Sequence, residues 1–294
     1  MGINGGTGIV GSGSVLGGSG ISLPKGGGGG GFDPDAQAAI TAIGADATIG
    51  GYLNQLFLDL KGEGNTTNGT NVYAKCPAIY PMSPSDISTI SDATCKWNVK
   101  DPRDLDAAFR LTFVNTPLFS IANGLEQNGS VNAYARTFFN ASTEFSAGNN
   151  GITISISNAV NASPATYLSG TSWFSFQKAY SGSPNGFKLN ARSEGVSLQF
   201  AGEIITEAIY SFSRRTSTDL EIYKNGNSFA TSSTLTSQPL DNLESFILAL
   251  NNAGSPSNYA KSSLDFVVFH EGLTDAESQD LADAISNWKT NLGR

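Results

Sequence analysis

The chain has 294 residues, of which 39% are hydrophobic and 14% charged, with a formal net charge of −8 and a pI of about 4.6. This acidic balance, without any run of Lys or Arg, excludes a track for phosphates, so nucleic acid is not an expected partner. No stretch approaches the ~20 apolar residues of a membrane span, and no basic segment followed by an apolar one opens the chain, so we expect no classical secretory signal.

Residues 1–31 form a glycine-rich arm, in which 15 residues are glycine and 26–31 is an unbroken glycine run. Glycine loses the most conformational entropy on ordering, so the arm is not expected to fold alone. One interpretation is a disordered linker. Seven Ile, Val and Leu residues among the glycines favour a second, in which the arm is buried against neighbouring subunits.

Residues 32–64 are predicted to form a helical connector of two short helices. Asp33-Pro34-Asp35 supplies an N-cap and a first-turn proline, and Gly44 ends that helix. From about 48 to 61, apolar residues recur at i, i+3, i+4 and i+7, which predicts a second helix. Two such helices cannot form a core alone, so we expect them to pack on the next domain or on another subunit.

Residues 65–294 carry β signals and one final helix. Ile152, Ile154 and Ile156 alternate with polar residues, as in a half-buried strand. Asn225-Gly226 between 220–224 and 227–230 predicts a hairpin with a type I′ turn. The apolar runs 246–250 and 264–269 indicate core strands. A capping box at 274–277 predicts a helix that reaches 292.

The two cysteines, Cys76 and Cys95, flank segments that look like neighbouring strands. A single disulfide and two buried free thiols both remain open. Metal binding by this pair is not expected, because no histidine or further cysteine lies nearby.

Several segments together carry a resemblance to a known family. They are 75–81, 98–113, 132–135, 220–226, 250–254, 272–277 and 292–294. In order and spacing they resemble bacteriophage and prophage virion proteins with a concanavalin A-like (laminin G-like) jelly-roll domain, over roughly residues 33–294. The resemblance implies a mainly β sandwich of two antiparallel sheets, with two short N-terminal helices, a C-terminal helix and the arm outside the match. It supplies no catalytic residues.

The resemblance implies a virion structural protein of the tail-fibre, spike or capsid-decorating type. The arm would anchor the chain to other virion proteins, a homo-oligomer such as a trimer would form, and the lectin-like domain would bind a host-surface glycan. A purely structural virion component is the first alternative, and a glycan-degrading enzyme is the second. No cofactor is implied.

The enzyme hypothesis lacks the residues that it needs, so we predict no enzymatic activity. Glycosidases on this fold need two carboxylates across one sugar linkage. The nearest pairs are Asp219 with Glu221, which we interpret as solvated hairpin surface, and Glu203 with Glu207, which no third carboxylate completes. The single histidine, His270, is interpreted as a polar residue at a strand end.

A glycan would bind through aromatic faces and polar loop groups. The candidates are Trp173, Tyr180 and Asn185, the last two in an expected glycine- and serine-rich loop over 180–186. Asp241 and Asp265 are conceivable calcium ligands, but no segment resembles a calcium-binding loop, so metal binding stays undecided.

Overall fold

The computed structural model describes residues 31–294 except 129–131, 160–164, 172–173, 181–182, 192–197, 201–205 and 235. Over 165–171, 177–180, 183–191 and 198–200 it describes the backbone without the side chains. Residues 32–294 form one compact unit, whose fold is given below. Residues 1–30 of the predicted arm lie outside the described residues.

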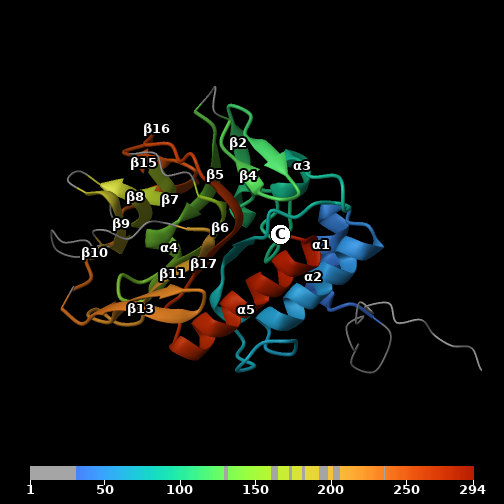
Figure 1. Ribbon diagram of the computed structural model, residues 1–294, viewed down its shortest axis with the longest axis horizontal. Helices are drawn as coiled ribbons and strands as arrows, with labels where there is room; N and C mark the ends of the chain where they lie inside the picture. Colours follow the sequence, from blue (N-terminus) through green and yellow to red (C-terminus); the bar gives the residue numbers. More distant parts are fainter. Residues whose placement is uncertain are drawn as a thin grey trace, which may run out of the picture. The chain divides into compact units, whose positions relative to one another are not determined.

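One antiparallel sheet has eight strands, in the order β13-β12-β11-β6-β17-β4-β3, with β1 paired to β17 (Figure 1). The bounds are β1 (Ala78–Tyr80), β3 (Leu118–Ser120), β4 (Gly124–Glu126), β6 (Asn150–Asn158), β11 (Ala208–Arg214), β12 (Leu220–Lys224), β13 (Asn227–Ser232) and β17 (Ser263–His270). We call it the eight-stranded sheet.

The facing antiparallel sheet has seven strands, in the order β10-β9-β8-β7-β14-β5-β2. A separate two-stranded hairpin joins β15 to β16. The bounds are β2 (Thr112–Val114), β5 (Tyr134–Asn140), β7 (Ala165–Thr171), β8 (Phe174–Tyr180), β9 (Ser183–Ala191), β10 (Leu198–Phe200), β14 (Glu244–Ile247), β15 (Leu250–Asn252) and β16 (Ser255–Ser257).

Apolar side chains from both sheets meet in a sandwich core. Ile152, Ile154 and Ile156 of β6 all point into it, as their alternation predicts. Phe139 of β5 stacks on Phe269 of β17 with ring centroids 4.3 Å apart, which joins the two sheets across the core. The predicted fold class, a mainly β jelly-roll sandwich with flanking helices, is confirmed.

Three longer helices accompany the sandwich: α1 (Pro34–Ile43), α2 (Ala47–Leu60) and α5 (Asp275–Leu292). Shorter segments are α3 (Asp92–Cys95), α4 (Ala141–Glu144) and the 3₁₀ turns Tyr73–Lys75 and Asp106–Ala108. The predicted caps form: Asp33 accepts from the N–H groups of Asp35 and Ala36, and Thr274 and Glu277 make a reciprocal capping box.

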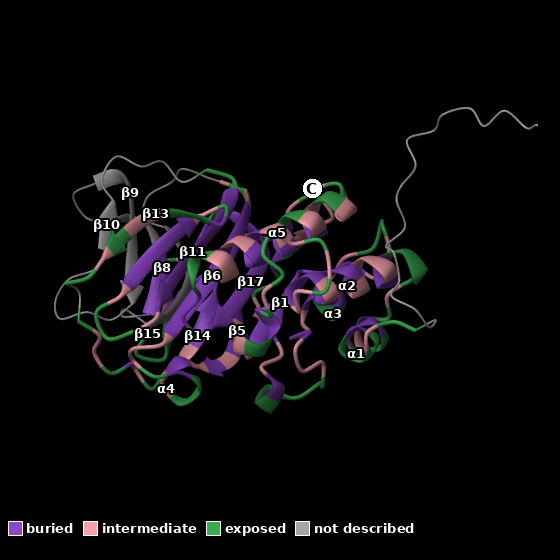
Figure 2. Ribbon diagram, turned by 90° about the horizontal axis from the view of Figure 1, so that it is seen from below, coloured by how far each residue is buried: buried purple, intermediate pink, exposed green. Residues whose placement is uncertain are grey.

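The helices pack on the outer face of the eight-stranded sheet and create a second, helical core (Figures 1 and 2). Phe266 and Val268 of β17 point into this helical core, while Val267 and Phe269 point into the sandwich core. Strand β17 is therefore buried on both faces, which explains its continuous apolar run. The two short N-terminal helices therefore pack on the domain that follows them in the same chain, which is one of the two expected arrangements.

The predicted hairpin is present, with Asn225 at φ 50° and Gly226 at φ 77° between β12 and β13. The predicted strand over 246–250 is wrong in its extent. Leu248 adopts φ 66°, which breaks the extended backbone, so β14 ends at Ile247 and β15 begins at Leu250.

Cys76 and Cys95 are both buried free thiols. They belong to different cores, Cys76 to the helical core and Cys95 to the sandwich core, so no disulfide joins them. Burial raises the pKa of each thiol to about 12, which keeps both protonated and unreactive at neutral pH.

One buried carboxylate fastens the loop that follows α2 to helix α5. Asp280 accepts hydrogen bonds from the backbone N–H of Asn68 at 2.7 Å and from the N–H and hydroxyl of Thr70, both at 2.6 Å. Burial raises the pKa of Asp280, but the hydrogen bonds from Thr70 and Asn68 outweigh burial and lower the pKa below its ordinary value.

We expect Asp280→Asn to lower the free energy of unfolding by about 2 kcal/mol at pH 7, because hydrogen bonds to a charged group contribute on that order. The folded-state pKa is depressed, so this contribution is present above the unfolded pKa and is lost as the pH falls through the folded pKa. Denaturant unfolding should therefore show a smaller gap between variant and wild type at low pH. A gap of equal size at both pH values would contradict the assignment, and exposed Glu63→Gln serves as the control.

Candidate functional site

The ligand-binding residues expected from the sequence fall mostly where side chains are not described. Trp173 lies outside the described residues. The loop expected over 180–186 is wrong for 183–186, which belong to β9 and pair with β8 through Ser183 and Tyr180. The structure gives only the backbone of Tyr180 and Asn185. Their role in binding a glycan stays a prediction.

The carboxylates Asp219 and Glu221 meet at the guanidinium of Arg215, which donates to Asp219 Oδ2 and Glu221 Oε2, both at 2.7 Å. The Tyr223 hydroxyl donates to Glu221 Oε2 at 2.8 Å. Glu221 is 4% exposed, so its interpretation as solvated hairpin surface is wrong: the side chain turns inward to Arg215 and Tyr223.

Some glycosidases use a tyrosine as their nucleophile, and an adjacent carboxylate could act as its base. Here Tyr223 is fully buried, so no sugar can reach its hydroxyl. Burial raises the pKa of Tyr223 far above its ordinary value, and the hydrogen bonds to Glu221 and Asp275 add to this. The group is therefore a structural network. Of the other predicted pair, Glu203 lies outside the described residues and Glu207 is exposed.

His270 ends β17 and is completely buried. Its Nδ1 lies 2.6 Å from the carbonyl oxygen of Glu271, which fixes the proton on Nδ1. Nε2 is then an acceptor, and it faces the hydroxyls of Thr153 at 2.9 Å and Ser211 at 3.4 Å. Burial lowers the pKa of His270 to about 4, so the ring is neutral at pH 7. The interpretation as a strand-end residue holds, and the ring lies out of reach of a substrate.

The conceivable calcium ligands are Asp241, a half-buried residue ahead of β14, and Asp265 on β17. Asp265 is buried and faces the Lys289 ammonium, 3.1 Å from Oδ2, so a cationic side chain already compensates its charge. Within the described ranges, no three His, Cys, Asp or Glu residues are placed to hold a metal ion. Over the same residues, none of the helices is long and apolar enough to cross a bilayer.

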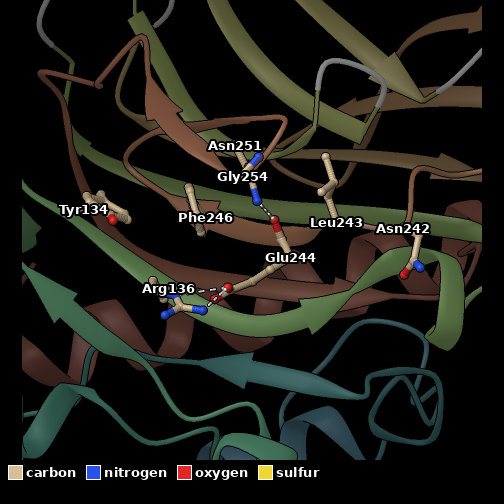
Figure 3. A pocket seen from close by; sticks show the side chains of 8 residues that line it. All are labelled: Tyr134, Arg136, Asn242, Leu243, Glu244, Phe246, Asn251 and Gly254. Carbon is tan, nitrogen blue, oxygen red and sulfur yellow. Dashed lines mark hydrogen bonds and ion pairs between the residues drawn. The ribbon is translucent and has the colours of Figure 1, made fainter.

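A depression of about 400 Å³ lies on the outer face of the seven-stranded sheet, over β5 and β14 (Figure 3). We call it the β5–β14 depression. Along β5, Ala135 and Phe139 enter the sandwich core, whereas Tyr134 belongs to a separate small cluster outside it. Alternation along the strand therefore places Tyr134 and Arg136 on the outer face. The residues that line the β5–β14 depression are Tyr134, Arg136, Asn242, Leu243, Glu244, Phe246, Asn251 and Gly254.

The register between β5 and β14 is irregular at the depression. Phe246 pairs with Arg136, but Glu244 pairs with Asn140, so β5 carries two more residues than β14 across the same interval. Phe138 in this bulge adopts φ 55°, and its N–H donates to Glu244 Oε1 at 2.8 Å. The bulge thus turns a backbone donor toward the carboxylate and holds Glu244 beside Arg136.

Arg136 and Glu244, which both line the depression, form an ion pair (Figure 3). The guanidinium donates from Nη2 at 2.7 Å and from Nε at 3.1 Å, both to Glu244 Oε2. The hydrogen bond to Glu244 raises the pKa of Arg136. The guanidinium also lies over the ring of Phe138, 4.7 Å from its centroid. The arginine is therefore fixed in orientation although its side chain is 44% exposed.

The β15–β16 hairpin supplies one wall of the depression. Asn251 on β15 is buried, donates from Nδ2 to the carbonyl of Glu244 at 2.7 Å and accepts from the N–H of Gly254 at 2.7 Å. Gly254 at φ 92° and Ala253 at φ 51° form the tight turn of this hairpin. Asn251 therefore positions the wall by fastening it to β14.

An aromatic pair forms the floor. Tyr134 and Phe246 lie on neighbouring strands with ring centroids 5.0 Å apart, and Tyr259 packs on Tyr134 at 6.1 Å. Around this floor, no hydrogen bond between described residues uses Arg136 Nη1, Asn242 Nδ2 or the Tyr134 hydroxyl. These atoms remain available to a ligand.

Sequence reasoning missed every lining residue of this depression. Tyr134, Asn251 and Gly254 fall within the resemblance segments 132–135 and 250–254, and Phe246 falls within an expected core strand, but none of them is predicted as a site residue. The alternation of Tyr134, Arg136 and Phe138 along one strand was a usable signal for an outward face. Glu244, the partner of Arg136, comes 108 residues later in the chain, and no local sequence pattern predicts that pairing.

No family model matches the chain, and no curated protein matches it. Solved structures do match. Trypanosoma rangeli sialidase in complex with 2,3-difluoro-KDN is 13% identical over 71% of this chain and 32% of that chain, with a TM-score of 0.48. NanB sialidase from Streptococcus pneumoniae is 17% identical over 48% and 25%, with a TM-score of 0.34.

A third match is the CBM40 of the Ruminococcus gnavus IT-sialidase bound to alpha2,3 sialyllactose, 13% identical over 44% of this chain and 78% of that chain, with a TM-score of 0.34. At these identities the likeness concerns the fold alone. The chain spans about a third or less of the length of the two sialidases.

The predicted function, a bacteriophage virion structural protein, is wrong by this finding. The matching structures named above are two sialidases and a CBM40 bound to a sialylated sugar. The glycan-degrading alternative agrees with them better than the virion hypothesis does. The family resemblance and the location on a virion stay predictions from the sequence.

Proposed function

We propose that the chain is a carbohydrate-binding module that holds a sugar in the β5–β14 depression and does not hydrolyse it. The observation that carries the proposal is the composition of the depression: an aromatic floor of Tyr134 and Phe246 beside polar atoms to which no described residue forms a hydrogen bond. A volume of about 400 Å³ is within the range of small-molecule sites.

A sugar ring has apolar C–H faces and a rim of oxygen atoms, so a complementary site combines apolar surface with fixed donors. The depression offers donors from Arg136, Asn242 and Tyr134 around its floor. Arg136 and the hairpin wall are held by Glu244 and Asn251 before any ligand arrives. Such preorganisation lowers the entropic cost of binding.

The absence of hydrolysis is supported by the acids near the depression. Of its eight lining residues only Glu244 is acidic, and its two oxygens already accept from Phe138 and Arg136. Retaining and inverting glycosidases with paired carboxylates need two acids across the scissile bond. The Tyr223–Glu221 group, which has the other suitable chemistry, is buried.

Binding is tested by screening the full chain on a glycan array and titrating the best ligand by calorimetry. We expect Asn242→Ala to weaken that ligand about five- to tenfold, because one hydrogen bond from an exposed amide is lost. Asn252→Ala is the matched control, since Asn252 is also an exposed asparagine, on the hairpin that forms the wall, but does not line the depression. Equal effects of the two substitutions would place the site elsewhere.

Hydrolysis is tested with fluorogenic glycosides, α-sialosides included. We expect release of fluorophore at the rate of the buffer blank. Turnover above the blank that disappears in Tyr223→Phe would overturn the non-enzymatic half of the proposal and would make the Tyr223 network catalytic.

A further inference from the structure

We propose that the β5–β14 depression recognises a carboxylate group on its sugar, and that the outward edge of the Arg136 guanidinium holds it. This inference rests on the proposed function, because it names the ligand class of the same site. It starts from the hydrogen bonds that Arg136 makes and from those that it leaves unmade.

A guanidinium carries five N–H donors in one plane. Arg136 uses Nε and Nη2 toward a single oxygen, Glu244 Oε2, at 3.1 and 2.7 Å. The Nη1 donors and the second Nη2 donor remain, and together they form the edge of the fork opposite Nε. Two parallel donors on a planar edge match the two oxygens of a carboxylate. The 44% exposure of the side chain leaves that edge open to solvent.

Glu244 does not compete for this edge, because its position is fixed by other contacts. Its Oε1 accepts from the Phe138 N–H at 2.8 Å, and the backbone carbonyl of Glu244 accepts from Asn251. The carboxylate therefore stays on the Nε side of the fork. Its charge is balanced by Arg136, so an incoming carboxylate meets a neutral pair with donors turned toward it.

The neighbouring unused groups have the same character. Asn242 has its Nδ2 donor without a partner among the described residues, since its Oδ1 accepts from Asn140 Nδ2. The Tyr134 hydroxyl can donate as well. The available groups around Arg136 are thus hydrogen-bond donors, which favours a ligand rich in acceptor oxygens.

Arg110 and Arg215 lack this setting, because carboxylates occupy their guanidinium groups. Arg110 is shared by Asp104 and Asp106, and Arg215 binds three carboxylates. Arg103 pairs with one carboxylate, that of Asp101, and is 64% exposed, but it does not line the β5–β14 depression. Arg103 is therefore a matched control for the loss of one exposed arginine.

The test titrates trigalacturonate, a hyaluronan tetrasaccharide and 3′-sialyllactose, each beside its carboxyl-reduced counterpart, into the full chain. We expect at least one carboxylated probe to bind about tenfold or more tightly than its reduced counterpart, as expected for a charge-assisted pair. Arg136→Gln should remove that preference and leave the affinity for the reduced sugar within about twofold. Arg103→Gln should preserve the preference.

A second variant is expected to raise the affinity for a carboxylated probe, and it leaves the donors of Arg136 in place. Glu244→Gln removes the negative charge beside the ligand and keeps one acceptor oxygen for Arg136, while its amide NH2 replaces the oxygen that accepts from the Phe138 N–H. We expect it to tighten the carboxylated probe about three- to tenfold at low salt. Thermal unfolding of each variant shows whether the fold is kept.

The outcomes separate this inference from the proposed function. Equal affinity for carboxylated and reduced probes overturns the carboxylate assignment and leaves glycan binding in place. Sulfated lactose bound as tightly as the carboxylated probes also overturns it, because the site would then accept any anion. Failure of every probe on these titrations and on the array overturns the proposed function, and the inference with it.

Discussion

Replacement of Lys289 by Met is expected to lower the free energy of unfolding by about 3–5 kcal/mol, because it leaves a buried carboxylate without its cation. Asp265 on β17 is completely buried, and the Lys289 ammonium lies 3.1 Å from its Oδ2. Neither carboxylate oxygen accepts a hydrogen bond from the residues that the structure describes. Arg294 also attracts Asp265 and remains in the variant, which sets the expectation near the lower end.

Denaturant unfolding of three variants tests this prediction. Asp265→Asn should cost less than Lys289→Met, because the Lys289 side chain is 19% exposed and can turn its ammonium to water. The double variant Asp265→Leu/Lys289→Met should recover most of the loss, since a buried ion pair can be replaced by apolar side chains at little cost. A cost below about 1 kcal/mol for Lys289→Met alone would mean that the ammonium does not compensate Asp265.

The features that the sequence predicts correctly are those whose causes are local. The caps at Asp33 and Thr274 depend on residues within three positions, and the turn at Asn225-Gly226 depends on two residues that tolerate positive φ. The alternation of Ile152, Ile154 and Ile156 needs only the period of one strand. The fold class follows from such local signals, together with the resemblance.

The candidate site depends on contacts between distant residues, so sequence reasoning could not assemble it. Arg136 meets Glu244 across 108 positions, and the meeting requires a bulge at Phe138 with φ 55°. Bulky aromatic residues seldom adopt that angle, so the residue types in this segment do not predict the bulge. The break at Leu248, which frees the β15–β16 hairpin to form the wall, is hidden in an apolar run for the same reason.

Charged groups in this chain were misjudged for a related reason. Glu221 follows a hairpin pattern that normally faces water, yet it is buried because Arg215 and Tyr223 reach it from the same sheet. Asp265 sits in an apolar strand and suggested a cation ligand, whereas Lys289 from the last helix supplies the cation. In both cases the carboxylate is buried beside a cationic side chain, Arg215 or Lys289, that comes from another part of the chain.

The helical core and the sandwich core share strand β17, which implies that they unfold together. Phe266 and Val268 of this strand contact the helical core, while Val267 and Phe269 contact the sandwich core. Loss of either core exposes one face of the same strand. A substitution in the helical core should therefore destabilise the β5–β14 side of the sandwich as well.

Trp288→Ala is expected to lower the free energy of unfolding by about 3–5 kcal/mol, the usual cost of removing a large aromatic from a core. Trp288 of α5 is 1% exposed, and its indole Nε1 donates to the Pro81 carbonyl at 3.1 Å, which joins the last helix to the segment after β1. Trp288→Phe should cost less, because it keeps most of the apolar contact. Ile87→Ala, at a 69% exposed residue, should change the free energy of unfolding by less than about 0.5 kcal/mol.

Unfolding of Trp288→Ala followed by circular dichroism and by tyrosine fluorescence should give one coincident transition at lower denaturant, because β17 couples the two cores. Two separate transitions would show instead that the helices can leave the sandwich folded, and the shared strand would then not be what holds the layers together.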